Sequence, residues 1–406
     1  MTTIGKSLSR PTGARPHAWL RAALAMFVVG WGANQFAPLL LAYQEQSHLT
    51  QASVSAMFGV YAVGLIPALL VAARLSDRLG RRRVIRPVLI VSALSSVVLI
   101  IGVHQEWALF AGRLLAGVAS GAAFGPGSAW IKELSEGGPV GSGSRRATVA
   151  VSAGFGGGPL VAGLIAQWLP DPEVLPYVVH IALVLVIAPL VWVAPETVGC
   201  PGRQESPSRP TSVRASLMHS HFLRRVLPTA PWVFGTASVS FAVLPGMVAA
   251  DGKGLMVSGA AAGLTLGTGV LLQPLARRLE AHRPGWTFRV GMLVAVAGMA
   301  LAAATAATAN LLVLAVAAIF LGGAYGMLMV AGLAQAEALA DADDLATVTG
   351  VFYCLAYLGF AAPFLIVVLR PLLPPAELFC IAAAAALLTV PMTMARPMSP
   401  EPKAAD

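Results

Sequence analysis

Charged residues are scarce in this chain of 406 residues, because they make up 11% of it against 57% for hydrophobic residues. An average soluble domain carries roughly twice that share of charge, so this chain cannot cover its surface with polar groups in water. A helix that crosses hydrocarbon needs about 20 apolar residues, since its backbone groups must bond internally there. Apolar runs of that length recur along the sequence. We therefore expect a membrane protein that has the lipid bilayer as a partner.

Cysteines and catalytic motifs are also few. Cys200, Cys354 and Cys380 are far apart and have neither metal-site spacing nor the density of a disulfide scaffold. The sequence shows no zinc spacing, no phosphate-binding loop and no arrangement of Ser, His and Asp that suggests a triad. We expect no enzyme activity, no cofactor and no metal. The net charge of +9 does not indicate nucleic-acid binding, because the basic residues form short blocks without interleaved aromatic residues.

Twelve apolar runs are long enough to cross a bilayer. Arg113 is the one fully charged residue that interrupts them. The runs lie at about 22–44, 52–73, 87–105, 107–131, 147–170, 174–195, 226–250, 254–276, 290–308, 310–336, 345–369 and 378–395.

Positive charge is distributed unevenly between the two sides of these spans. Of the 27 Lys and Arg residues, 24 fall on the side that carries both termini, and only Lys253 and Arg370 fall on the other. Because basic loops are retained in the cytoplasm, both termini are predicted to be cytoplasmic.

The longest polar interruption divides the chain into two halves. It is rich in Ser, Pro and Arg, which predicts a flexible cytoplasmic linker over 196–225 between bundles of six helices at 1–195 and 226–406. The halves also echo each other, since Gly117 and Gly121 match Gly322 and Gly326 at an offset of about 200 residues. Parallel halves related by an axis normal to the membrane are a transporter architecture.

The connection between the second and third spans carries the most specific motif. Residues 73–85 read ARLSDRLGRRRVI and resemble the cytoplasmic signature of the major facilitator superfamily of secondary transporters, which has Gly where this chain has Ala73. A tight turn at Gly80 would place Asp77 among cations or near a helix N-terminus. A plain basic loop would explain the arginines but neither Asp77 nor Gly80 at this spacing.

The resemblance implies an all-α membrane protein of twelve helices in two pseudo-symmetric six-helix bundles. It also implies a cytoplasmic gate that holds the outward-facing state. The residues of this gate would be Asp77, Arg78, Gly80, Arg81 and Arg82.

Arg113 lies in the fourth span, where residues 113–121 read RLLAGVASG and resemble a second signature of the superfamily. An arginine inside a membrane is costly unless it is paired or hydrated, so it is a functional candidate by default. The resemblance implies a role in proton relay or substrate contact. The alternative is that its long side chain reaches the membrane interface.

The fifth span contains GFGGGPLVAG at residues 154–163, which resembles the signature of exporters and antiporters in the superfamily, with Ala162 in place of one paired glycine. Gly154 and Gly158 share a helical stripe that lets another helix approach closely, and Pro159 permits a kink. A helix hinge at Gly154, Gly158, Pro159 and Gly163 is predicted. Ordinary packing of small residues is the alternative.

Candidate cavity residues come from three spans. The first span reads WGANQFAP at residues 31–38, which places Trp31, Asn34 and Gln35 at mid-membrane, where polar side chains face a cavity or a partner helix. In the resembled fold, Trp232 and Tyr325 lie on spans that surround the same cavity. The alternatives are hydrogen bonds between helices for the amides and aromatic packing for the rings.

No carboxylate lies inside a predicted span, although the chain has 18 Asp and Glu residues. Proton-coupled exporters usually need an ionisable group there. Proton coupling would therefore have to run through Asp77, Glu133 or His180, or the carrier would be a facilitator.

The residues and the resemblance together predict a transporter that exports a small molecule by alternating access, with proton antiport as a candidate driving force. A facilitator or importer of a neutral or anionic metabolite is the alternative. A non-transporting membrane sensor or a membrane-embedded enzyme is the alternative of another class. We expect a multi-pass monomer in a bacterial inner membrane, with a small-molecule substrate and protons as candidate partners.

Overall fold

A computed structural model describes residues 17–139, 142–197, 217–248, 251–339 and 345–394. All regular secondary structure in these residues is helical, which confirms the all-α prediction. Helices are expected here because each satisfies its own backbone hydrogen bonds in hydrocarbon.

The first bundle is built from the first half of the chain. Its helices are α1 (Ala18–Asn34), α2 (Phe36–Glu45), α3 (Gln51–Leu79), α4 (Arg81–Ile101), α5 (Glu106–Glu133), α6 (Ser142–Trp168) and α7 (Leu175–Trp192). The helices α1 and α2 form one span, Ala18–Gln44, that is interrupted at Gln35. Pro38 explains the interruption, because it has no N–H to donate to the carbonyl of Asn34.

The second bundle follows the same plan. Its elements are η1 (Phe222–Val226), α9 (Leu227–Ala242), η2 (Leu244–Met247), α10 (Gly254–His282), α11 (Trp286–Thr308), α12 (Leu311–Leu339), α13 (Leu345–Tyr357), η3 (Leu358–Ala361), α14 (Ala362–Leu369), α15 (Pro375–Thr389) and η4 (Pro391–Met394). Pro363 explains why α13 and α14 are separated by η3, since it cannot donate to the carbonyl of Gly359.

Eleven helical segments among the described residues are long and apolar enough to cross a membrane. The predicted seventh span contains α9, which has 16 residues and ends shortly before η2. With α9 as the twelfth span, the count agrees with the twelve predicted from the apolar runs.

The predicted echo between the halves corresponds to equivalent helix contacts. A Cβ atom added to Gly117 would lie 2.1 Å from the carbonyl oxygen of Tyr61, so α5 packs closely on α3. A Cβ atom added to its counterpart Gly322 would lie 2.2 Å from the carbonyl oxygen of Thr265, so α12 packs in the same way on α10. Both contacts depend on small residues that let backbones approach closely.

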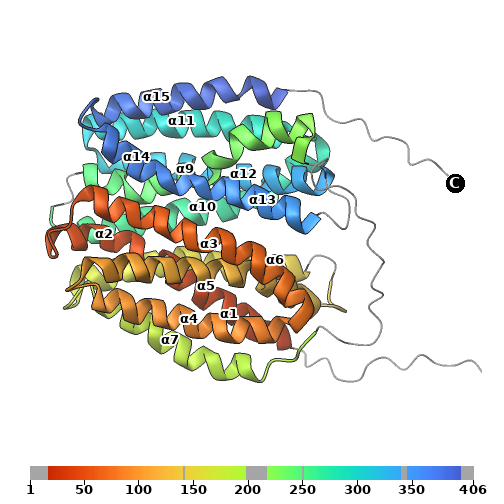
Figure 1. Cartoon of the computed structure of the whole chain (residues 1–406). Helices are drawn as coiled ribbons and strands as arrows, with labels where there is room; N and C mark the ends of the chain where they lie inside the picture. The colour runs from red at the N-terminus through yellow and green to blue at the C-terminus, as the bar shows by residue number, and fades with distance from the viewer. Residues whose placement is uncertain (1–16, 140–141, 198–216, 249–250, 340–344, 395–406) are drawn as a thin grey trace, which may run out of the picture.

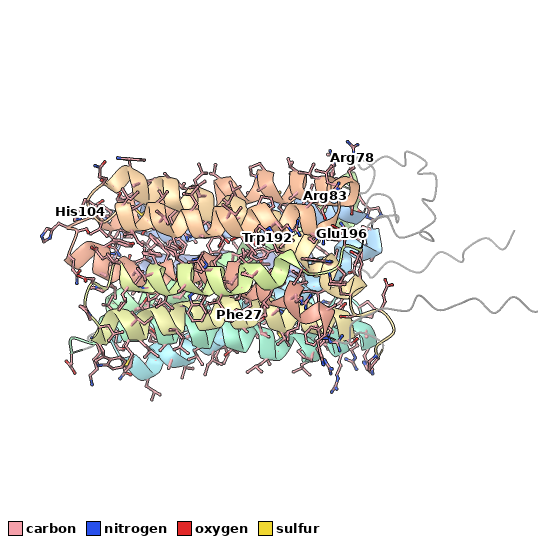
Figure 2. The ribbon with its side chains drawn as sticks, turned by 90° about the horizontal axis from the view of Figure 1, so that it is seen from below. Phe27, Arg78, Arg83, His104, Trp192 and Glu196 are labelled. Atoms are coloured by element: carbon pink, nitrogen blue, oxygen red, sulfur yellow. The ribbon has the colours of Figure 1, made fainter. Side chains whose placement is uncertain are left out.

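The bundles lie side by side, with α1 to α7 in one layer of Figure 1 and α9 to α15 in the other. They meet where α6 and α2 pack on α10, and where α3 packs on α13, η3 and α14. Figure 2 shows Arg78, Arg83 and Glu196 at one end of the helices and His104 at the other. We call these the arginine-rich end and the opposite end.

Candidate functional site

A small cavity lies where the two bundles meet, and its volume of about 10 Å³ is close to the smallest that can hold one water molecule. The first bundle contributes three residues to its lining and the second contributes five. They are Asn34, Tyr61, Phe155, Phe234, Phe241, Leu266, Tyr357 and Phe360. Six of these eight residues are aromatic and none of them is charged.

Four aromatic rings form a stack that crosses from one bundle to the other. The rings of Phe234 and Tyr357 are 4.4 Å apart and inclined by 10°. Phe234 also stacks on Phe360 at 5.0 Å, and Phe360 stacks on Phe58 of α3 at 6.0 Å. Each such pair contributes about 0.5–1.5 kcal/mol beyond buried area. The contact between the bundles at this cavity is therefore made largely by stacked aromatic rings.

The predicted cavity residues do not all line this cavity. Asn34 does, and the ring of Tyr325 supports the lining from behind, 5.6 Å from the ring of Phe234. Trp31 packs instead on Phe27, at a ring distance of 5.7 Å. Trp232 packs against the apolar core of the second bundle.

Gln35 points into the first bundle rather than toward the cavity lining. Its amide nitrogen donates to Ser96 Oγ at 3.2 Å, and Ser96 Oγ lies 2.8 Å from His180 Nδ1. His180 Nε2 lies 3.1 Å from the carbonyl oxygen of Val28. A carbonyl only accepts, so Nε2 carries the proton and Ser96 donates to Nδ1. His180 is thus a hydrogen-bonded packing residue of this bundle.

Arg113 is 1% exposed, so its side chain does not extend to the membrane interface. Its guanidinium donates to the carbonyl oxygen of Ala33 at 3.0 Å. The guanidinium carbon lies 4.6 Å from the ring centroids of Phe36 and Tyr61 and 5.5 Å from that of Phe58. Desolvated cation–π contacts of this kind contribute about 2 kcal/mol. Tyr61 links Arg113 to the cavity, since its ring contacts the guanidinium and also lines the cavity.

Three hydrogen bonds between described residues join the two bundles, and all three lie at the opposite end. The guanidinium of Arg370, after α14, donates to Gln51 Oε1 at 2.8 Å. The Gln167 side chain at the end of α6 donates to the carbonyl oxygen of Gly252 at 2.8 Å and accepts from the N–H of Met256 at 3.2 Å. We call the contact of Gln51 with Arg370 and the contact of Gln167 with Gly252 and Met256 the glutamine clasps.

A second cavity of about 150 Å³ lies beside one of the clasps. Gln44 and Gln51 from the first bundle and Ser258 and Arg370 from the second are its polar lining residues. It is therefore a polar vestibule between the bundles at the opposite end.

The arginine-rich end holds an ion cluster around Arg81, which is 6% exposed. Its guanidinium contacts Asp77 of α3 at 2.5 Å and Glu133 of α5 at 3.1 Å. Gly80 connects α3 to α4 with a φ of 103°, which fits the tight turn expected there. Arg78 is exposed, whereas Arg82 donates to the carbonyl oxygen of Ala194 at 3.3 Å.

Glu196 completes this cluster and caps α4. Its carboxylate accepts from the N–H of Arg81 at 2.9 Å and from the N–H of Arg82 at 3.0 Å. A carboxylate at a helix N-terminus satisfies free N–H groups and interacts favourably with the helix dipole. The beginning of the predicted linker is thereby attached to the predicted gate, while residues 198–216 of that linker lie outside the described residues.

The sequence matches the family model of the Major Facilitator Superfamily over residues 22–363. The chain belongs to this superfamily. A comparison with curated proteins gives no match. Among solved structures, the fold is similar to that of a mutant of the nucleoside transporter NupG, with 12% identity and a TM-score of 0.72 over 93% of this chain and 99% of that chain. As a member of the superfamily, the chain is a transporter and not an enzyme.

The glycine motif of this transporter, at residues 154–163 of α6, makes two kinds of close contact. A Cβ atom on Gly154 would lie 2.2 Å from the carbonyl oxygen of Phe27, so this part of the motif packs on α1 within one bundle. Further along α6, a Cβ atom on Gly163 would lie 2.9 Å from the Cα atom of Gly259, across the interface between the bundles. The stripe therefore brings α6 close to two different helices.

The structure gives two acidic residues of this transporter roles that were not expected from the sequence. Glu196 lies 115 residues from the N–H group of Arg81 that it caps. Glu173 lies in the connection between α6 and α7, outside every predicted span, yet it is 5% exposed. The sequence gives no periodic signal for either, because both act from connections between helices.

Proposed function

We propose that the protein exports a small molecule across a bacterial inner membrane by alternating access, with its arginine-rich end in the cytoplasm. The cavity that both bundles line carries this proposal, because a rocking movement of the bundles would open it toward one side at a time. The clasps close the opposite end, as one of two alternating states requires.

The proposed orientation and domain division rest on the charge pattern. Of the 27 basic residues, 24 belong to the side that carries both termini. We place the first bundle at 1–195, the linker at 196–225 and the second bundle at 226–406. The Arg81 cluster would then be the cytoplasmic gate of the resembled family.

The direction of transport is proposed from α6. Its glycine and proline residues match the exporter signature, and Gly163 lies at the interface that must slide when the bundles rock. Proton antiport is proposed as the driving force, and Arg113 as the buried cation that responds to the substrate.

The substrate is proposed to be neutral or anionic and to contain a planar ring. Aromatic rings dominate the described cavity lining, and the guanidinium of Arg113 lies over the ring of Tyr61, which belongs to that lining. A cationic substrate would find no carboxylate there. A nucleoside, the class named for NupG, is a neutral molecule with such a ring, so import or facilitated diffusion of a nucleoside-like metabolite is the second candidate function.

Uptake into inverted membrane vesicles tests the proposal. Three probes cover the charge classes, namely uridine, salicylate and the cation ethidium. We expect uptake of uridine or salicylate above that of vesicles without the protein, and loss of accumulation when the pH gradient is dissipated. Uptake that does not depend on the pH gradient would favour a facilitator. Absence of uptake for all three probes would contradict the proposed transport.

A matched pair of variants tests the site. Tyr357→Ala removes a ring of the stack, and aromatic stacking contributes about 1–3 kcal/mol per ring, so apparent affinity should fall roughly 5- to 150-fold. Phe320→Ala removes a ring that is 38% exposed toward lipid and should leave uptake unchanged. Equal uptake by both variants, at equal expression, would argue against the site.

A further inference from the structure

Glu173 is the one buried acidic residue among the described residues, with 5% of its surface exposed. Its carboxylate accepts a hydrogen bond of 2.7 Å from Ser47 Oγ. Ser47 lies in the connection between α2 and α3, and Glu173 lies in the connection between α6 and α7. A single hydrogen bond therefore joins two connections of the first bundle.

The same two connections lead to the glutamine clasps. Ser47 is followed four residues later by Gln51, which accepts from Arg370, and Glu173 follows Gln167 by six residues. The contact between Ser47 and Glu173 thus ties together the segments that hold the second bundle at both clasps.

A second polar contact, between Tyr43 and Tyr177, lies about one helical turn further from the opposite end than the contact between Ser47 and Glu173. Tyr43 precedes Ser47 by four residues, Tyr177 follows Glu173 by four residues, and their hydroxyl oxygens are 2.9 Å apart. Arg113 interacts electrostatically with both tyrosines, as Glu173 does. The polar groups therefore continue from the opposite end toward the central site, which explains how a carboxylate can be tolerated in this buried position.

We propose that Glu173 is a proton-binding site that controls closure of the opposite end, so that binding of one proton stabilises the clasped state. This inference rests on the proposed alternating access. When the clasps open, the segments next to Ser47 and Glu173 lose their hydrogen bonds to the second bundle, and water reaches the carboxylate from the side that this bundle had covered.

The sign of the pH dependence follows from the surroundings of Glu173. Burial raises the pKa of this carboxyl in the clasped state, while the hydrogen bond from Ser47 and the nearby His104 act in the opposite direction. Tyr43 and Tyr177 are the other titratable groups that face it. In the open state the pKa should return toward the ordinary value for Glu of about 4.3. The clasped state is then favoured fully below that ordinary value, and the advantage is lost as the pH rises through the raised pKa.

Spin-label distances test this linkage without any substrate. Labels at Trp107→Cys and Leu312→Cys, which are 64% and 73% exposed, report the separation of the bundles at the opposite end. The three native cysteines, Cys200, Cys354 and Cys380, are first replaced by serine. We expect the open fraction to rise as the pH increases from about 4.3 through the raised pKa of Glu173, by up to tenfold for each pH unit that separates the two pKa values.

Three variants decide the assignment. Glu173→Gln should stay clasped and lose the pH response, while Asp171→Asn, an exposed position in the same connection, should keep it. Ser47→Ala removes a donor and should move the midpoint to higher pH. If Glu173→Gln shows the same pH response as the unchanged protein, the proposal is wrong. This comparison holds even where a variant is less stable, because it concerns the pH dependence of the distance and not the amount of folded protein.

The outcome is independent of the transport assay. If the vesicles take up no probe but the pH response depends on Glu173, the proton site stands and the proposed export fails. If uptake depends on the gradient while Glu173→Gln keeps the pH response of the spin labels, export stands and the proton site fails.

Discussion

Gly80 shows how a single residue combines two demands at the arginine-rich end. Its φ of 103° lies in the region that side chains rarely adopt, and an added Cβ atom would lie 2.6 Å from Glu196 Oε2. The turn and the capping carboxylate therefore both depend on the missing side chain.

Gly80→Ala should destabilise the protein more than Gly137→Ala does. Both substitutions strain a positive φ, at a cost of roughly 1–3 kcal/mol, but an added Cβ atom at Gly137 meets nothing within 4 Å. Thermal unfolding followed by tryptophan fluorescence in detergent measures the difference. Equal melting temperatures for the two variants would show that contact with Glu196 is unimportant.

Residues inside spans were easier to predict than residues in connections. Arg113 was singled out because charge in an apolar run is visible in the sequence, and the structure buries it among aromatic rings. Glu173 and Glu196 each follow a proline in a connection between helices, with no motif around them, and their burial or capping role arises only when distant segments meet. Tyr61 and Tyr357 were missed for a related reason, because aromatic residues are common in these spans.

At the scale of the helices, α6 carries two contact surfaces on its small residues. Gly154 and Gly158 pack on α1, whereas Gly156 has nothing within 4 Å of an added Cβ atom. The spacing of four residues that defines the stripe in the sequence is therefore the spacing of the contacts in the structure.

Gly154→Ala should separate α6 from α1, whereas Gly156→Ala should be tolerated. Inserting a methyl group where a backbone oxygen lies 2.2 Å away forces a backbone shift, which typically costs about 1–3 kcal/mol. The apparent melting temperature and the uptake of the best probe measure the effect. If both variants lose stability to the same degree, helix propensity or expression explains the loss rather than close packing.

Sequence patterns placed the helices well but not their ends. The predicted second and eighth spans end near residues 73 and 276, where charge begins, yet α3 and α10 continue to Leu79 and His282. Charged residues leave the hydrocarbon without ending a helix, so hydropathy marks the membrane and not the helix. The breaks in the first and eleventh spans instead follow from Pro38 and Pro363, which remove backbone donors.

At the scale of the whole molecule, the twofold plan was predictable and the conformational state was not. The repeated glycines report contacts within each half, and such contacts do not depend on how the two halves are oriented. The clasps join different halves through half-buried glutamine side chains, and a sequence does not tell at which end of the molecule the contacts between the halves are formed. Such contacts are small in energy by necessity, because a transporter must break them in each cycle.

Removing both clasps should open the opposite end. A hydrogen bond contributes about 1 kcal/mol net, so the three bonds lost in the Gln51→Ala, Gln167→Ala double variant should shift the equilibrium by up to roughly 3 kcal/mol, or about 100-fold. The Trp107 and Leu312 spin labels should then report a longer distance at every pH. Gln105→Ala, at the same end, is the control and should retain the shorter distance. An unchanged distance in the double variant would mean that the apolar contact of α6 with α10 closes this end without help from the clasps.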